Sequence, residues 1–247
     1  RPPRSTPKPS SAASDVYKRQ LYEDLGLFTC DEVMAKDVTN VFNLLTGFAP
    51  EQRFDKLLVA PRYMRKGMLD LIDHEIEEAK ASKPARIIAK MNSLEDPQII
   101  ERLYEASMAG VEIDLIVRGV CRLRPGIAGL SERIRIHSVI GRFLEHSRLY
   151  YFYHSGEHIY TIGSADWMHR NLDARVEVIT PIESEQLKKY LQFVLEIYLK
   201  DNRQRWMLEA DGTYSKASTT EKGVKKGTHR AMMKHISSSK TPIPMPS

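Results

Sequence analysis

Residues 118–175 hold the side chains best suited to binding anions. The window contains nine arginines and no lysine. A guanidinium group grips carboxylate or phosphate oxygens at two points, whereas a merely solvated charged face normally mixes arginine with lysine. The arginines stand at positions 118, 122, 124, 133, 135, 142, 148, 170 and 175. Two interpretations remain open: at least three of them face a polyanion, or they pair with internal acids such as Glu132, Glu145, Asp166, Asp173 and Glu177.

Within this window, GRFLEHSRLYYF places His146 two residues before Arg148 at the start of an aromatic stretch. Positions two apart in a strand point to one face of the sheet. A histidine beside a guanidinium can act at a transferring phosphoryl group as hydrogen-bond donor or general acid. The alternative is a structural histidine, which is the commoner role. The Gly-Ser pair in the downstream IGSADWMHRN favours a site, because histidine, base and Gly-Ser in this order resemble half of a phospholipase D-type active site. Arg148 replaces the usual lysine, however, and Phe152 stands where an aspartate is expected.

Two further segments end predicted strands with polar residues. VRGVCRLRPG places Arg118 at a strand end and Arg122 and Arg124 in the following loop. KMNSLEDPQII places Lys90, Asn92 and Ser93 at the end of the preceding strand. Because ligands bind at the carboxyl ends of strands in α/β sheets, we expect these groups to share one rim. For Asn92 and Ser93, capping of the helix that begins near Asp96-Pro97 is the favoured alternative.

The elements that must position these side chains form an α/β pattern. From Pro84 onward a strand, a short helix and a strand follow one another, which predicts parallel neighbours. This block contains predicted strands at 85–91, 111–119, 133–139, 148–155, 158–165 and 175–182, helices at 95–110 and 184–206, and a turn at Ser155-Gly156. Residues 21–82 predict a strand edge, a helix at 33–46, a short strand at 56–61 and an amphipathic helix at 62–82. The predicted fold class is α/β, with a mixed sheet flanked by helices.

The first twenty residues do not read as protein. SSAASDVYKRQ, at residues 10–20, matches the translation of a common transposon-type sequencing adapter, and residues 1–6 fit the upstream primer in the same frame. We therefore interpret residues 1–20 as translated library DNA and exclude them from the fold.

This exclusion changes the charge. The whole chain has 37 Lys+Arg and 32 Asp+Glu. Residues 1–20 hold five bases and one acid, and residues 216–247 hold seven and one, which leaves 25 bases and 30 acids for residues 21–215. The sequence pI of about 9.1 is therefore no argument for a nucleic-acid-binding body.

The remaining composition bounds the class of protein. Cys30 and Cys121 lack metal-ligand spacing and are too few for a disulfide framework, which favours a reducing, cytoplasmic compartment. No apolar run approaches the roughly 20 residues of a membrane-spanning helix. Residues 216–247, rich in Ser, Thr and Lys with a proline-rich end, predict a disordered basic tail.

The chain resembles the C-terminal part of bacterial polyphosphate kinases of the long, ATP-using family. The resemblance covers residues 21–214 and rests on four segments in one order: LYEDLGLFT, KMNSLEDPQIIERLYEASMAGVEIDLIVRGVCRLRPG, IGRFLEHSRLYYF and SADWMHRNLDARVEV. It implies reversible transfer of the terminal phosphoryl group of ATP to inorganic polyphosphate through a phosphohistidine, with Mg²⁺. It also implies two phospholipase D-like domains with the site between them. Residues 21–82 would end the first domain, residues 83–215 would form the second, and residues 216–247 would be the tail.

The resemblance also assigns roles to single residues. Tyr22 and Asp24 match the family's Y-x-D segment, with the tyrosine near the adenine. Arg118 matches the arginine of V-R-G, a phosphate contact. His146 matches the second essential histidine, in F-L-E-H, which is expected at the nucleotide phosphates and is not the phosphorylated residue. We add Arg148 as a phosphate contact and Arg122 and Arg124 as polyphosphate contacts.

The departures from the family pattern concern the nucleophile. The phosphorylated histidine of the family lies in a K-T-H segment upstream of Y-x-D, as do its magnesium-binding arginines, and adapter-like sequence stands in that place. We therefore expect no metal ligands in this chain and no phosphoryl transfer by the chain alone. The complete protein is expected to be a homo-oligomer without specific nucleic-acid partners, cytoplasmic or peripheral to the inner membrane. The alternatives are an inactive polyanion-binding module and a phospholipase D-like phosphodiesterase acting through His146.

Overall fold

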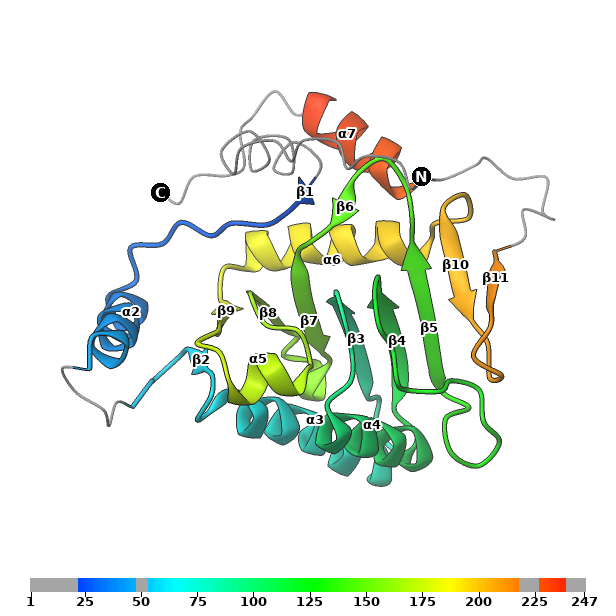
Figure 1. Cartoon of the computed structure of the whole chain (residues 1–247), viewed down its shortest axis with the longest axis horizontal. Coiled ribbons are helices and arrows are strands. Elements are labelled where there is room, and N and C mark those ends of the chain that lie inside the picture. Colours follow the sequence, from blue (N-terminus) through cyan, green and yellow to red (C-terminus); the bar gives the residue numbers. More distant parts are fainter. Residues whose placement is uncertain (1–21, 48–52, 218–226, 239–247) are drawn as a thin grey trace, which may run out of the picture.

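The computed structural model describes residues 22–47, 53–217 and 227–238, so the adapter-like residues 1–20 lie outside it. The strands are β1 (Tyr22–Glu23), β2 (Leu58–Val59), β3 (Arg86–Met91), β4 (Glu112–Val117), β5 (Ile134–Val139), β6 (Leu144–Glu145), β7 (Arg148–Phe152), β8 (Ile159–Gly163), β9 (Val178–Ile182), β10 (Arg205–Leu208) and β11 (Tyr214–Lys216). The helices are α2 (Glu32–Leu45), α3 (Met64–Lys80), α4 (Pro97–Ala109), the short 3-10 turn η1 (His154–Gly156), α5 (His169–Asp173), α6 (Glu185–Leu199) and α7 (Thr228–Ser238). Figure 1 shows their arrangement.

One mixed sheet dominates the molecule. Its nine strands run in the order β11-β10-β5-β4-β3-β7-β8-β9-β2. The central pairs β3-β4 and β4-β5 are parallel, and the other neighbours are antiparallel. A second, very small sheet joins β1 to β6 in parallel. The prediction of an α/β fold with parallel neighbours around the short helix is confirmed.

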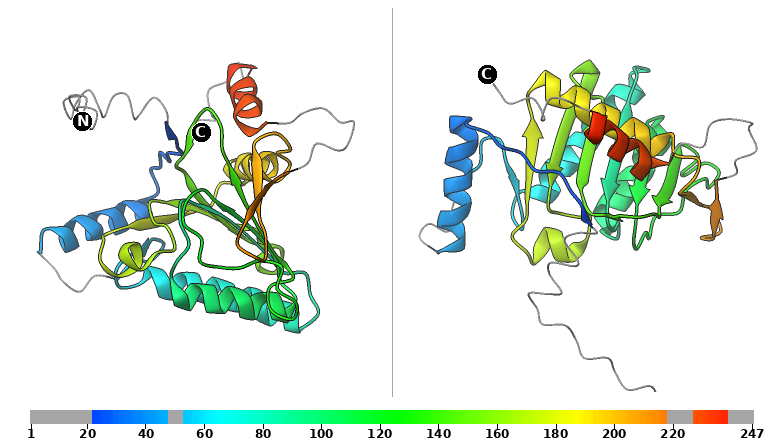
Figure 2. Two further views of the ribbon diagram at one scale, coloured as in Figure 1. Left: turned by 45° about the vertical axis from the view of Figure 1, so that its right-hand side comes forward. Right: turned by 90° about the horizontal axis from the view of Figure 1, so that it is seen from above.

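The two faces of the sheet carry separate apolar cores. Ile87, Ala89 and Met91 of β3 point to the face covered by α3 and α4. Ile88 points to the opposite face, covered by α6, where it joins the core that contains Leu191. Figure 2 shows these helices on opposite sides of the sheet. A central strand buried on both faces is mostly apolar, which explains Ile87, Ile88, Ala89 and Met91 in β3.

Local signals in the sequence set the ends of α4. Asp96 caps its N-terminus by accepting a hydrogen bond from the Ile99 amide, and Pro97 occupies the first turn. Gly110 ends the helix in the left-handed conformation, with φ 110°. The chain therefore leaves β3 at the rim and runs back along α4. It then returns to the same rim as β4, which ends just before Arg118.

The structure differs from the sequence prediction near the C-terminus. The closing helix ends at Leu199 and not near residue 206, because the buried Asp201 carboxylate accepts hydrogen bonds from the amides of Arg203 and Gln204 and turns the chain into β10. The prediction of a disordered tail is wrong for residues 228–238, which form α7. Thr228 and His229 are buried and anchor this helix, which the polar composition of the tail does not indicate.

The division at residue 82 remains a prediction, but the packing favours an earlier boundary. Strand β2 pairs with β9 of the main sheet. Helix α3 buries Met64, Met68 and Ile72 in the same core as α4.

Among the described helices, none combines the length and the apolar content that a membrane span requires.

Candidate anion-binding site

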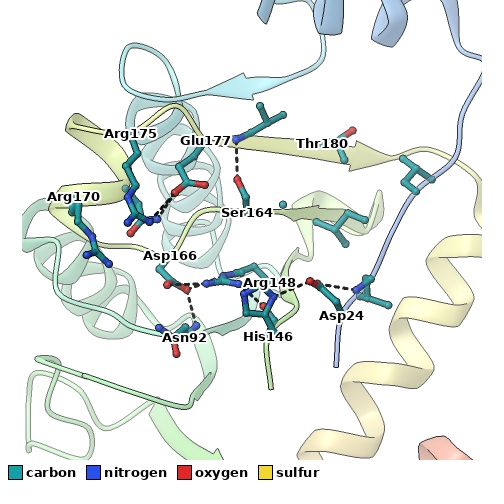
Figure 3. A pocket seen from close by; sticks show the side chains of 16 residues that line it. Asp24, Asn92, His146, Arg148, Ser164, Asp166, Arg170, Arg175, Glu177 and Thr180 are labelled. Carbon is teal, nitrogen blue, oxygen red and sulfur yellow. Dashed lines mark hydrogen bonds and ion pairs between the residues drawn. The ribbon is translucent and has the colours of Figure 1, made fainter. Parts of the chain in front are cut away.

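A pocket of about 550 Å³ opens at the rim predicted from the sequence, where β3 and β8 end and β7 and β9 begin. Asp24, Asn92, His146, Arg148 and Asp166 contribute to its lining. Figure 3 shows their side chains around the opening. The rim also requires a glycine, since a Cβ at Gly163 would lie 2.4 Å from the carbonyl oxygen of Val178.

His146 is held by the small β1-β6 sheet. Its backbone amide donates to the carbonyl of Glu23 over 3.1 Å. Its ring Nδ1 lies 2.8 Å from Oδ2 of Asp24, and the Tyr22 ring meets the imidazole edge-on with 4.9 Å between ring centroids. The structure thus brings together Tyr22, Asp24 and His146, three residues that the sequence analysis named from distant segments. The imidazole side chain is about one third exposed, so a ligand can reach it.

Arg148 shares the pocket with His146 but is already paired. Its Nε and Nη2 donate to the two carboxylate oxygens of Asp166 over 3.1 and 3.2 Å, and Nη1 donates to the carbonyl of His146 over 2.5 Å. Asp166 also accepts a hydrogen bond from the backbone amide of Asn92 over 2.7 Å. Arg148 therefore fixes the rim by joining the β8 loop, the end of β3 and His146.

Arg118 follows the end of β4 beside the pocket but is not among the residues that line it. Its Nη2 donates to the Asn92 side-chain oxygen, a neutral partner. Its Nε is buried and has no hydrogen-bond partner among the described residues. Burial and the nearby Arg148 lower the pKa of the Arg118 guanidinium, although the group remains a strong base. Arg118 is partly buried and pairs with no acid among the described residues, and a bound anion would offset the cost of burying its charge.

Two arginines that the sequence analysis placed only in the general window also line the pocket. Arg170 is exposed, and Arg175 lies 3.8 Å from the buried Glu177 carboxylate. Both come from the segment that follows β8 (Figure 3). The dense arginine content was the signal for them, but spacing alone did not single them out.

Other arginines of the window either lie away from the pocket or pair with acids. Arg122 is exposed in the loop after β4, outside the pocket lining. Arg124 donates to the carbonyl of Ala210 near the β10-β11 turn, also away from the pocket. Neither therefore shares the rim expected for it. Four members of the window pair with acids, namely Arg133, Arg135, Arg148 and Arg175.

The polar residues at the end of β3 have roles other than those favoured from the sequence. Asp96 caps α4, so the capping role expected of Asn92 and Ser93 is wrong. Asn92 instead lies at the pocket and bonds Arg118. Lys90 is 1% exposed and points away from the pocket, toward carboxylates behind His146.

The carboxylates at the pocket do not make a magnesium site. Asp24 contacts His146 and the Leu25 amide, Asp166 is bound by Arg148, and Glu177 accepts the Asn171 side chain over 2.6 Å. Mg²⁺ demands nearly octahedral oxygen ligands, and these oxygens are already engaged. The carboxylates that line the pocket are therefore not free to hold a metal ion.

A second acidic cluster lies on the α3-α4 side. Asp96, His169 and Asp173 bring three possible ligand atoms within 4.8 Å of one another. The Arg65 guanidinium already bonds both aspartates. This cluster is accordingly an ion-pair network.

Comparisons with known proteins point to one family. A family model described as polyphosphate kinase C-terminal domain 2 matches residues 57–227. Polyphosphate kinase of Thermosynechococcus vestitus is 56% identical over 86% of this chain and 29% of its own length. That of Pseudomonas aeruginosa is 46% identical over 88% of this chain and 31% of its own length.

A solved structure of the same family is also similar. The crystal structure of polyphosphate kinase from Porphyromonas gingivalis matches with a TM-score of 0.78 and 38% identity, over 85% of this chain and 32% of that one. The chain thus spans about a third of the length of the relatives it matches. The chain belongs to the polyphosphate kinase family.

Proposed function

We propose that the complete protein transfers the terminal phosphoryl group of ATP to inorganic polyphosphate, and that this chain supplies the pocket for the phosphates. The observation that carries the proposal is the placement of Arg118 beside the rim that holds His146: it is partly buried and pairs with no acid in the part of the chain that the structure describes. Family membership supports the reaction class. The part of the protein that carries the phosphorylated histidine of the family is expected upstream of residue 21.

Residues of the pocket lining, together with Tyr22 and Arg118 beside it, would each contribute a distinct interaction. The half-exposed Tyr22 ring can stack on an adenine base. Arg118 would bind a phosphate with its guanidinium fork. His146 would donate a hydrogen bond to a transferring phosphoryl oxygen, with Asp24 orienting its ring. Arg148, held by Asp166, would keep this arrangement rigid and add positive potential.

Arg170 and Arg175 extend the positive side of the pocket beyond these residues. Both line it, and the side chain of Arg175 is half exposed. A linear polyanion longer than one phosphate group could therefore contact them in sequence. Arg122 and Arg124, which lie outside the lining, are expected to contribute only long-range attraction.

The same proposal covers the context of the complete protein. Mg²⁺ would accompany ATP, with ligands mostly outside this chain. The complete protein would be a homo-oligomer, cytoplasmic or attached at the inner face of the membrane. The family match from residue 57 and the packing of β2 and α3 support a domain boundary near residue 57.

The test measures binding and turnover separately. Tripolyphosphate is titrated into the chain by calorimetry at about 50 and about 150 mM salt, for the wild type, Arg118→Ala and the control Arg133→Ala, whose side chain pairs with Glu112 at the surface. We expect binding that weakens with salt, a roughly tenfold loss for Arg118→Ala and no change for Arg133→Ala. Equal affinities for the wild type and Arg118→Ala would contradict the proposal. ATP-dependent polyphosphate synthesis by the chain alone would contradict the expected absence of the nucleophile.

A phosphodiesterase acting through His146 remains the alternative from the sequence. The aspartate of such a half-site is replaced by Phe152, which is fully buried and cannot act at the pocket. Hydrolysis of bis(p-nitrophenyl) phosphate by the wild type but not by His146→Ala would favour it.

A further inference from the structure

A cluster of buried polar side chains lies directly behind His146. It joins Lys90 of β3, Glu145 of β6, Tyr198 of α6 and His229 of α7, each no more than 5% exposed. Glu145 is the residue before His146, so whatever holds its carboxylate also holds the backbone of the pocket histidine. Burying charged groups is unfavourable unless they are paired, which makes the partners of this cluster specific.

Lys90 ties the small β1-β6 sheet to the main sheet. Its ammonium group lies 3.1 Å from the carboxylate of Glu23 on β1 and 3.0 Å from that of Glu145 on β6. It also donates to the Ser147 hydroxyl over 2.7 Å and to the Ser147 carbonyl over 3.0 Å. A pair of two-residue strands is too short to be stable alone. The position of His146 therefore depends on these buried contacts.

Glu145 is the centre of the cluster. Burial opposes its ionisation, but hydrogen bonds from His229 and Tyr198 and the charge of Lys90 lower the pKa of the carboxyl to about 2. The carboxylate is thus charged at neutral pH and needs every one of its donors. Its Oε1 contacts His229 Nε2 over 2.5 Å, while Oε2 accepts from the Tyr198 hydroxyl.

His229 reaches this carboxylate from the far end of the chain. Its Nδ1 accepts the Phe143 amide over 3.3 Å, which leaves the proton on Nε2 and directs it at Glu145. The loop before β6 comes close to the ring, since a Cβ at Gly141 would lie 2.6 Å from Nδ1.

Helix α7 is anchored independently at its first residue. The amide and hydroxyl of Thr228 both donate to the buried Asp201 carboxylate over 2.7 Å. His235, about two turns further along, packs against the ring of Phe193 on α6, with 4.5 Å between centroids. One ring of α7 therefore contacts Glu145, and another packs on α6.

We propose that His229 is a positioning residue for His146. By donating to Glu145, it fixes β6 against the main sheet and sets the contacts of His146 with Asp24 and Tyr22. Without that donor, one buried oxygen of Glu145 loses its hydrogen bond, and β6 shifts from its position against the main sheet. The inference rests on the proposed function for the identity of the ligand, but the positioning itself does not. Helix α7, just beyond the residues matched by the family model, is thus part of the pocket's framework.

The experiment compares two amides at one position. In His229→Asn the side chain can still accept the Phe143 amide but is too short to reach Glu145. In His229→Gln the amide nitrogen lies near the place of Nε2 and can donate to Glu145. His235→Asn is the matched control on the same helix. The readouts are the ¹⁵N resonances of the His146 ring in the ¹⁵N-histidine-labelled chain and the affinity for tripolyphosphate.

We expect His229→Asn to move the His146 resonances and to weaken tripolyphosphate binding about tenfold. His229→Gln should restore most of both, and His235→Asn should leave both unchanged. A folded His229→Asn variant with wild-type His146 resonances would overturn the proposal. If His229→Asn does not fold, His229→Gln decides: wild-type His146 resonances support the donor role, and altered resonances or loss of folding contradict it.

The two proposals can fail separately. If the wild-type chain does not bind tripolyphosphate, the proposed function of the pocket is wrong. The His146 resonances of the variants still report whether His229 positions that ring.

Discussion

Two histidine–carboxylate pairs lie on either side of the peptide bond between Glu145 and His146. They have the same chemistry but differ in burial. His146 contacts Asp24 over 2.8 Å, with side chains 35% and 57% exposed. His229 contacts Glu145 over 2.5 Å, with both side chains 4% exposed. The first pair faces the pocket, and the second lies beneath it.

The difference in burial suits the two pairs to different roles. An exposed polar pair is weakly held and open to solvent, so a phosphate can reach the His146 ring at little cost while Asp24 orients it. A buried pair is costly to break, because removal of one partner leaves the other without solvation. The buried pair is therefore suited to hold a backbone in place, and the exposed pair to respond to a ligand.

The largest expected effect follows removal of the buried charge. Glu145→Gln leaves Lys90 and His229 without their shared carboxylate, and we expect the free energy of unfolding to fall by about 3 kcal/mol. Urea denaturation followed by circular dichroism measures it. A loss below about 1 kcal/mol would mean that the two pairs do not differ as burial requires.

The pH dependence of stability extends the comparison to His137, a buried histidine of β5. Burial lowers its pKa from 6.5 to about 4, so the unfolded chain takes up a proton between these values while the folded chain does not. Stability should therefore fall by about 3 kcal/mol as the pH drops from 6.5 to 4. Glu145, with a pKa lowered from 4.5 to about 2, loses its contribution in the window below, as the folded carboxylate is protonated.

His137→Leu separates these two windows. The variant should lose the decline between pH 6.5 and 4 and keep the decline between 4.5 and 2. Denaturation midpoints measured at a series of pH values give the profile. An unchanged slope in the upper window would show that His137 does not set it.

An intermediate effect is expected at Arg148, whose side chain is 11% exposed and pairs with a carboxylate that is 5% exposed. Arg148→Lys keeps the charge but removes the two-point contact with Asp166. We expect a loss of about 1–2 kcal/mol in unfolding free energy, together with weaker tripolyphosphate binding. Full stability in this variant would indicate that a single contact is enough to hold the rim.

The smallest effect is expected at the exposed pair. Asp24→Asn should change the unfolding free energy by less than about 1 kcal/mol, since the carboxylate is largely in water. The same thermal and urea melts measure it beside Glu145→Gln. A loss as large as that of Glu145→Gln would remove the distinction between the two pairs.

The sequence predicted the rim of the pocket better than its support. Strand ends placed Arg118, and residue spacing placed His146 and Arg148, because short-range pattern and sheet topology determine such positions. The resemblance added Tyr22 and Asp24. The cluster behind the pocket depends on contacts across many residues, such as Lys90 with Glu23 and His229 with Glu145, which no local pattern encodes. For the same reason the sequence pattern does not predict α7.

One titration tests the central claim, that the exposed histidine is the phosphate-binding one. Tripolyphosphate is added to the ¹⁵N-histidine-labelled chain, and the ring resonances of His146 and His229 are followed together. The account predicts that the His146 resonances move with saturable, salt-sensitive behaviour, while those of His229 stay nearly in place. Saturation with the His146 resonances unmoved would contradict it.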